Sequence, residues 1–117
     1  MMEINLWDYS KEYAELRDEI LTAVDRVFAS GRLILGEEVA GFEREFAACC
    51  GLNHPGVGVN SGTDALFIGL KALGIGAGDE VITVANTAVP TVAAIVSAGA
   101  KPRFVDIDPD SYLMDVA

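Results

Sequence analysis

The tripeptide Ser61-Gly62-Thr63 is the place where residue types and spacing best fit ligand chemistry. It follows a short apolar run, 57–59, which predicts a buried strand, and it opens a predicted helix. The first turn of a helix exposes unpaired N–H groups and the positive end of the helix dipole. Gly62 would let an anion approach the backbone, and the Ser61 and Thr63 hydroxyls could donate further hydrogen bonds. The turn therefore suits a phosphate, whereas the simpler interpretation makes Ser61 only a helix cap.

Other side chains capable of chemistry are isolated along the chain. His54 is the only histidine and is expected at the surface. Lys71 and Lys101 are also expected at the surface, whereas a Schiff-base lysine needs a desolvated site. Cys49 and Cys50 are neighbours, so neither a disulfide nor a metal-ligand spacing is predicted. The glycines fit neither the dinucleotide fingerprint nor the nucleoside-triphosphate loop. The sequence thus predicts no catalytic residue and no metal site.

The composition indicates one domain with an acidic surface. The chain has 117 residues, 51% of them hydrophobic, and a formal net charge of -10. This charge argues against binding to nucleic acid or to an anionic membrane. The first residues, 1–8, lack a signal-peptide pattern, and the unpaired cysteines fit a reducing, cytoplasmic setting.

One segment, 81–100, contains no charged residue and is long enough to span a bilayer. It contains several polar residues and divides into a strand and a helix. We therefore expect buried core and no membrane span.

The chain alternates between strand-like and helix-like patterns after two amphipathic helices. This order predicts an α/β fold with a mostly parallel sheet flanked by helices. Ligands bind at the carboxyl ends of such strands, where 60–63 and 86–91 should converge. The expected elements are helices 11–30 and 37–49, strand 56–60, helix 61–73, strand 80–85, helix 88–98 and strand 102–107.

The apolar residues of the N-terminal region are expected to be buried. They recur at helical spacing in both predicted helices and also fill the connector 32–36. The helical stripes consist of Leu16, Ile20, Val24 and either Val27 or Phe28 in the first helix, and of Val39, Phe42 and Phe46 in the second.

Several short blocks match a known family in order and spacing. They are Asn60-Ser61-Gly62-Thr63-Asp64-Ala65-Leu66, Ala72-Leu73-Gly74-Ile75-Gly76, Gly78-Asp79-Glu80-Val81-Ile82, Gly99-Ala100-Lys101-Pro102 and Phe104-Val105-Asp106-Ile107-Asp108-Pro109, with Tyr13-Ala14, Leu16, 31–36 and Phe42-Glu43 before them. Together they resemble the DegT-type nucleotide-sugar aminotransferases, which are fold type I enzymes that use pyridoxal 5'-phosphate. The resemblance covers nearly all of the chain.

The resemblance implies a cofactor site built partly by this chain. Ser61, Gly62 and Thr63 would bind the cofactor phosphate, and Ala88 occupies the position where the family often has an aromatic residue stacked on the pyridine ring. The family's Schiff-base lysine, and the aspartate and glutamine near the pyridine ring, match nothing here. Residues 1–117 would then form a single incomplete domain, which is part of the large domain and makes up the N-terminal third of such an enzyme. It would consist of a helical arm, 1–52, and the start of the cofactor-binding domain, 53–117.

The resemblance also implies a reaction and its partners. The complete enzyme would transfer an amino group, with glutamate as the expected donor, to a nucleotide-linked keto sugar, and would work as a homodimer. A chain of this extent is expected to be an inactive N-terminal fragment, since residues 111–117 begin a new element that the sequence does not complete. Two alternatives stay open: a sugar dehydratase of the same fold, with histidine in place of the lysine, and a non-catalytic fragment or interaction module.

Overall fold

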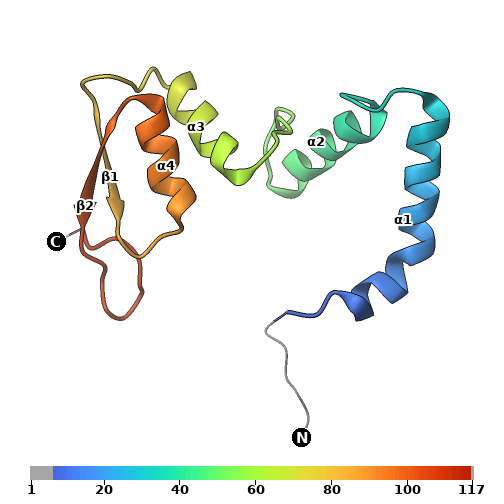
Figure 1. Ribbon diagram of the computed structural model, residues 1–117, viewed down its shortest axis with the longest axis horizontal. Coiled ribbons are helices and arrows are strands. Elements are labelled where there is room, and N and C mark those ends of the chain that lie inside the picture. The colour runs from blue at the N-terminus through green and yellow to red at the C-terminus, as the bar shows by residue number, and fades with distance from the viewer. Residues whose placement is uncertain (1–6, 117) are drawn as a thin grey trace, which may run out of the picture. The chain divides into compact units, whose positions relative to one another are not determined.

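The computed structural model describes residues 7–116, which form two compact units (Figure 1). The first unit spans Met1–Gly58 and the second Val59–Ala117, and each is considered by itself. The segment tested for a signal peptide is 1–8, and its residues 1–6 lie outside the described residues. Leu6 of the predicted N-terminal arm is among them.

The first unit contains two helices whose bounds match the predictions closely. Helix α1 spans Ser10–Ser30 and ends at Gly31, whose φ of 68° is the left-handed conformation that favours glycine. Helix α2 spans Glu37–Cys49. Arg26 Nε of α1 donates a hydrogen bond of 2.7 Å to Oε1 of Glu38, so an ion pair links the two helices.

The predicted burial of apolar side chains in the first unit is wrong for most of them, although Ile20 and Val39 are half-buried. Phe42 and Phe46 are 59% and 57% exposed, and their rings contact each other with centroids 5.5 Å apart. The connector residues Leu33, Ile34 and Leu35 are exposed as well. Helices α1 and α2 do not pack closely against each other, and no strand lies within residues 7–58 to cover their apolar faces.

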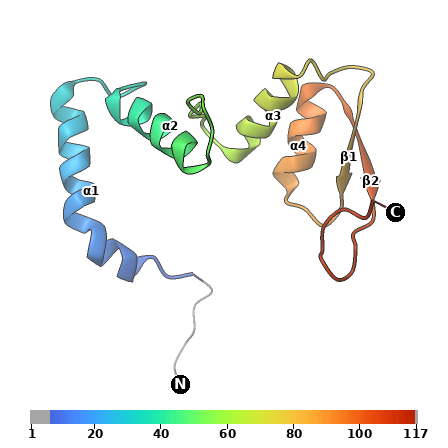
Figure 2. The same cartoon turned by 180° about the vertical axis from the view of Figure 1, so that it is seen from behind.

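The second unit is a compact α/β arrangement of two helices and two strands. Helix α3 (Gly62–Ala72) precedes strand β1 (Glu80–Val84), and helix α4 (Val89–Ala98) connects β1 to strand β2 (Lys101–Val105). The strands pair in parallel from Glu80 opposite Lys101 to Val84 opposite Val105. Helix α4 contacts both β2 and α3 (Figures 1 and 2). The predicted α/β class with a parallel sheet is confirmed.

The core of the second unit is built from small and β-branched residues. Ala94, Ile95 and Ala98 are buried on α4, with Ala100 and Thr83 beside them. Segment 81–100 thus divides into β1 and α4 as predicted, although Val89 and Val96 at the surface of α4 are exposed. Among the described residues, no helix is both long and apolar enough to cross a membrane.

The predicted buried strand at 56–60 is not formed in the described structure. Val57 is 81% exposed, and the neighbouring backbone donors bind helix α2 instead of a strand. Gly56 N–H donates to the Glu43 carbonyl at 3.0 Å, and Gly58 N–H donates to Glu43 Oε1 at 2.7 Å. A strand needs a neighbour to pair its backbone, and the sheet among residues 7–116 contains only β1 and β2.

Candidate functional site

Ser61 is the N-cap of α3. Its backbone is extended, with φ of −159°, and its side-chain oxygen accepts a hydrogen bond of 3.1 Å from Asp64 N–H. Its carbonyl accepts a second bond, of 3.0 Å, from Ala65 N–H. These two bonds begin the helix at Gly62, which confirms the capping role weighed for Ser61.

Several donors in the same turn are left for a ligand. Within residues 7–116, the N–H groups of Gly62 and Thr63 and the Thr63 hydroxyl have no hydrogen-bond partner. The Ser61 hydroxyl accepts from Asp64, so its own hydrogen can still be donated. A Cβ built on Gly62 would meet nothing within 4 Å, so an anion can approach this backbone from outside. The turn therefore has the donor set that a phosphate needs.

The charge of the turn comes from the backbone and not from basic side chains. Asp64 is half-buried in the first turn, where its carboxylate competes with an anion for the positive end of the dipole. The basic residue of α3, Lys71, lies in the last turn and donates to the Ala98 carbonyl at 3.4 Å. Recognition of a phosphate by residues 61–63 would therefore depend on N–H and hydroxyl donors.

A second polar turn follows strand β1. The Thr87 and Thr91 hydroxyls lie 2.9 Å apart, and Thr91 N–H donates to the Ala88 carbonyl at 3.0 Å. Ala88 is the exposed N-cap of α4 and has no side-chain cap. Helices α3 and α4 both start at the end of the unit where β1 and β2 finish (Figures 1 and 2). Ligand sites in parallel sheets lie at this end.

The structure thus places three of the four predicted cofactor residues in one turn and the fourth at another helix start. Ser61, Gly62 and Thr63 form the start of α3, and Ala88 caps α4. Their binding of a cofactor stays a prediction.

The residues predicted to lie at the surface do so. His54, Lys71 and Lys101 are exposed, and Cys49 and Cys50 are exposed and free. Within the part of the chain that the structure describes, no group of three or more His, Cys, Asp or Glu side chains could hold a metal ion.

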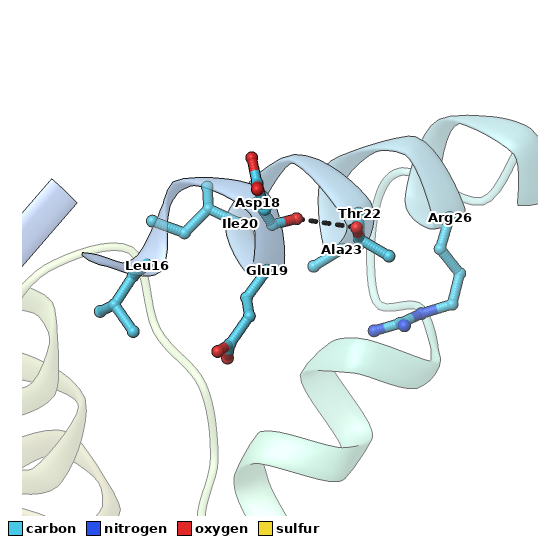
Figure 3. A pocket seen from close by; sticks show the side chains of 7 residues that line it. All are labelled: Leu16, Asp18, Glu19, Ile20, Thr22, Ala23 and Arg26. Carbon is cyan, nitrogen blue, oxygen red and sulfur yellow. Dashed lines mark hydrogen bonds between the residues drawn. The ribbon is translucent and has the colours of Figure 1, made fainter. Parts of the chain in front are cut away.

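A hollow on α1 is not a candidate site. Leu16, Ile20 and Ala23 line it with polar neighbours from the same helix (Figure 3). Its hydrogen bond joins Thr22 Oγ1 to the Asp18 carbonyl at 2.7 Å within one helical turn. It is the open side of a helix, and its one cationic side chain is already paired with Glu38.

Sequence reasoning gave Glu43 no structural role and named it only in the resemblance block Phe42-Glu43. In the first unit, Glu43 supplies both acceptors for segment 56–58. The glycines at 56 and 58 were a signal, because glycine often marks close backbone approach.

The fold and the site define a class before any comparison: a parallel α/β unit with an anion-suited helix start. The profile of the DegT/DnrJ/EryC1/StrS aminotransferase family matches residues 14–117. The chain belongs to this family, as its sequence blocks predicted.

Three known proteins illustrate the relationship. The dTDP-3-amino-3,4,6-trideoxy-alpha-D-glucose transaminase of Micromonospora megalomicea subsp. nigra is 51% identical over 114 residues, which cover 97% of this chain and 30% of that protein. The crystal structure of S. venezuelae DesV with a ketimine intermediate aligns with a TM-score of 0.93 and 43% identity, over 98% of this chain and 31% of DesV. Bacillus subtilis NtdA with bound PMP aligns with a TM-score of 0.82 and 34% identity, over 86% of this chain and 23% of NtdA. The chain therefore spans less than a third of each.

Proposed function

We propose that this chain supplies part of the phosphate site of a pyridoxal-phosphate-dependent nucleotide-sugar aminotransferase. The observation that carries the proposal is the set of unpartnered donors at the start of α3, namely the N–H groups of Gly62 and Thr63 and the Thr63 hydroxyl. Membership of an aminotransferase family and the PMP-bound state of NtdA support the choice of cofactor.

The residues of this chain would bind and orient the cofactor. The Gly62 and Thr63 donors, together with the Ser61 hydroxyl, would hold the phosphate, and Ala88 would lie toward the ring. When bound, pyridoxal phosphate supplies an electron sink for amino-group transfer. We assign no base to this chain, because Lys71 and Lys101 are both exposed.

The partners are proposed from the relatives. The Micromonospora relative is a transaminase of a dTDP-linked sugar, which favours a nucleotide-linked keto sugar as acceptor and an amino acid, with glutamate preferred, as donor. We also propose a homodimeric whole enzyme in the cytoplasm. Residues 1–52 would be its helical arm, and 53–117 the start of its cofactor domain.

An amino-transfer assay tests this function. The full-length protein that carries this chain should move the amino group of glutamate to a dTDP-linked 3-keto sugar when pyridoxal phosphate is present. The 117-residue chain alone should not, and borohydride should trap no cofactor on Lys71 or Lys101. Loss of a sugar hydroxyl without consumption of glutamate would favour the dehydratase, and turnover by the isolated chain would refute the proposal.

A further inference from the structure

Ser61 and Asp64 have the spacing of a capping box at the start of α3. In that motif the N-cap hydroxyl accepts the N–H of the residue three positions on, and the side chain of that residue accepts the N–H of the N-cap. The first bond is present, since Asp64 N–H donates to Ser61 Oγ at 3.1 Å. The second is absent: within residues 7–116 the Ser61 N–H has no hydrogen-bond partner. The box is therefore only half formed.

The Asp64 carboxylate is left without a partner of its own. It is half-buried, and among residues 7–116 it accepts no hydrogen bond and forms no ion pair. The basic residue of the same helix, Lys71, lies in the last turn and donates to the Ala98 carbonyl. The charged side chain nearest in sequence to the free donors of the turn is thus an unneutralised carboxylate.

The open half of the box adds a donor to the turn. With the Ser61 N–H free, the N–H groups of three consecutive residues, 61–63, are unpartnered within residues 7–116. A phosphate and a carboxylate are both favoured at the positive end of a helix dipole. A closed capping box would give the Ser61 N–H to Asp64, whereas a bound phosphate would need Asp64 to leave it. The two anions also repel each other.

We propose that Asp64 is a specificity-determining residue of the phosphate turn: its carboxylate competes with the phosphate for the donors at the start of α3, chiefly the Ser61 N–H. This inference rests on the proposed function of the turn. Every residue involved belongs to the second unit, Val59–Ala117. The competition lowers the affinity of the turn for a free phosphate ion, so that retention of the cofactor depends on its ring as well as its phosphate.

The test varies the length and the charge of one side chain in the full-length protein. Asp64→Asn keeps the size and removes the charge, whereas Asp64→Glu keeps the charge and extends its reach toward the Ser61 N–H. Asp79→Asn is the matched control, because it removes one negative charge before the start of β1 and keeps an acceptor for the Gly76 N–H. Dissociation constants are measured for pyridoxal phosphate, pyridoxal and inorganic phosphate, and each ligand-free variant is melted.

We expect affinity and stability to move in opposite directions. Asp64→Asn should bind pyridoxal phosphate and inorganic phosphate about threefold to tenfold more tightly, yet melt earlier, because the helix start loses a favourable charge. Asp64→Glu should close the box, bind both phosphates about threefold more weakly and melt no earlier than the parent. Pyridoxal, which lacks the phosphate, should bind all variants alike, and Asp79→Asn should match the parent for every ligand.

The outcomes separate this inference from the proposed function. If the parent binds pyridoxal phosphate and Asp64→Asn binds it no more tightly, or Asp64→Glu binds it no more weakly, the competition is wrong. Equal changes for pyridoxal, or an equal gain in Asp79→Asn, would also overturn it, since the effect would then not concern the phosphate or this carboxylate. If the parent itself does not bind pyridoxal phosphate, the proposed function is wrong.

Discussion

Helix α4 buries apolar side chains, whereas the apolar stripes of α1 and α2 are largely exposed to water. On α4, Ala94 and Ile95 are 0% and 3% exposed, whereas Leu21 on α1 and Phe42 on α2 are 44% and 59% exposed. The sequence predicted burial in both regions, from helical periodicity in 11–30 and 37–49 and from the absence of charge in 81–100. Burial needs a second layer, which α3 and β2 give to α4 and which nothing among residues 7–58 gives to α1 and α2.

The first prediction concerns association of the isolated chain and has the largest expected effect. Exposed apolar side chains such as Phe28, Leu33 and Phe42 should drive copies together, since large apolar patches favour association. Sedimentation velocity across a concentration series should show oligomers or aggregates. A monomer at all concentrations that melts in one two-state transition would contradict this prediction.

The second prediction compares one buried and one half-exposed residue. Ile95→Ala should lower the free energy of unfolding by about 2–5 kcal/mol, because it leaves a cavity beneath α4. Leu21→Ala on α1 should cost less than about half of that, since its side chain already contacts water. Urea denaturation of dilute chain measures both. Equal losses in the free energy of unfolding would mean that Leu21 is buried to the same degree as Ile95. The proposed contrast between α1 and α4 would then be wrong.

The third prediction concerns two surface ion pairs, one in each region, and has the smallest effect. Arg103 donates a hydrogen bond to Glu80 that lowers the pKa of this carboxyl, and Arg26 lowers the pKa of Glu38 in the same way. A lowered folded-state pKa means that the stabilisation is present above the unfolded-state pKa. It is lost as the pH falls through the folded-state value.

Glu80→Gln and Glu38→Gln should therefore melt slightly earlier than the parent at about pH 7, and the difference should shrink as the pH falls through the lowered folded-state pKa. Both carboxylates are exposed to water, so the two variants should behave alike despite their different surroundings. A difference that persists at the lower pH would show that the glutamine substitution acts through something other than the ion pair.

The bounds of the elements followed from the sequence where local signals were strong. Gly31 ended α1 and Ser61 capped α3, because left-handed glycine and capping hydroxyls act within one turn. The parallel sheet followed from the alternation of strand and helix patterns.

The predictions that were wrong depended on hydrogen-bond or packing partners that are distant in the sequence. Residues 57–59 have strand-like residues, yet Glu43 of α2 takes the backbone donors of Gly56 and Gly58. No local pattern reports such a partner fifteen residues away. The turn at 61–63 of the candidate site could be predicted from its composition. For segment 56–58 of the first unit, Gly56 and Gly58 signalled a close backbone approach, but nothing local identified Glu43 as the partner.

Cofactor titration of two variants in the full-length protein tests the central claim most directly. Thr63→Val keeps the shape of the side chain and removes its hydroxyl donor, and Ser61→Ala removes the cap. A hydrogen bond to a charged group is worth roughly 1.5–3 kcal/mol, so Thr63→Val should weaken pyridoxal phosphate binding about tenfold to a hundredfold. Ser61→Ala should lower stability by about 1 kcal/mol and affect affinity less.

The predicted result is a Thr63→Val protein that melts with the parent and binds pyridoxal phosphate at least about tenfold more weakly. The contradicting result is a Thr63→Val protein that binds the cofactor as tightly as the parent and only melts earlier. The turn at 61–63 would then be a helix cap and not a phosphate site.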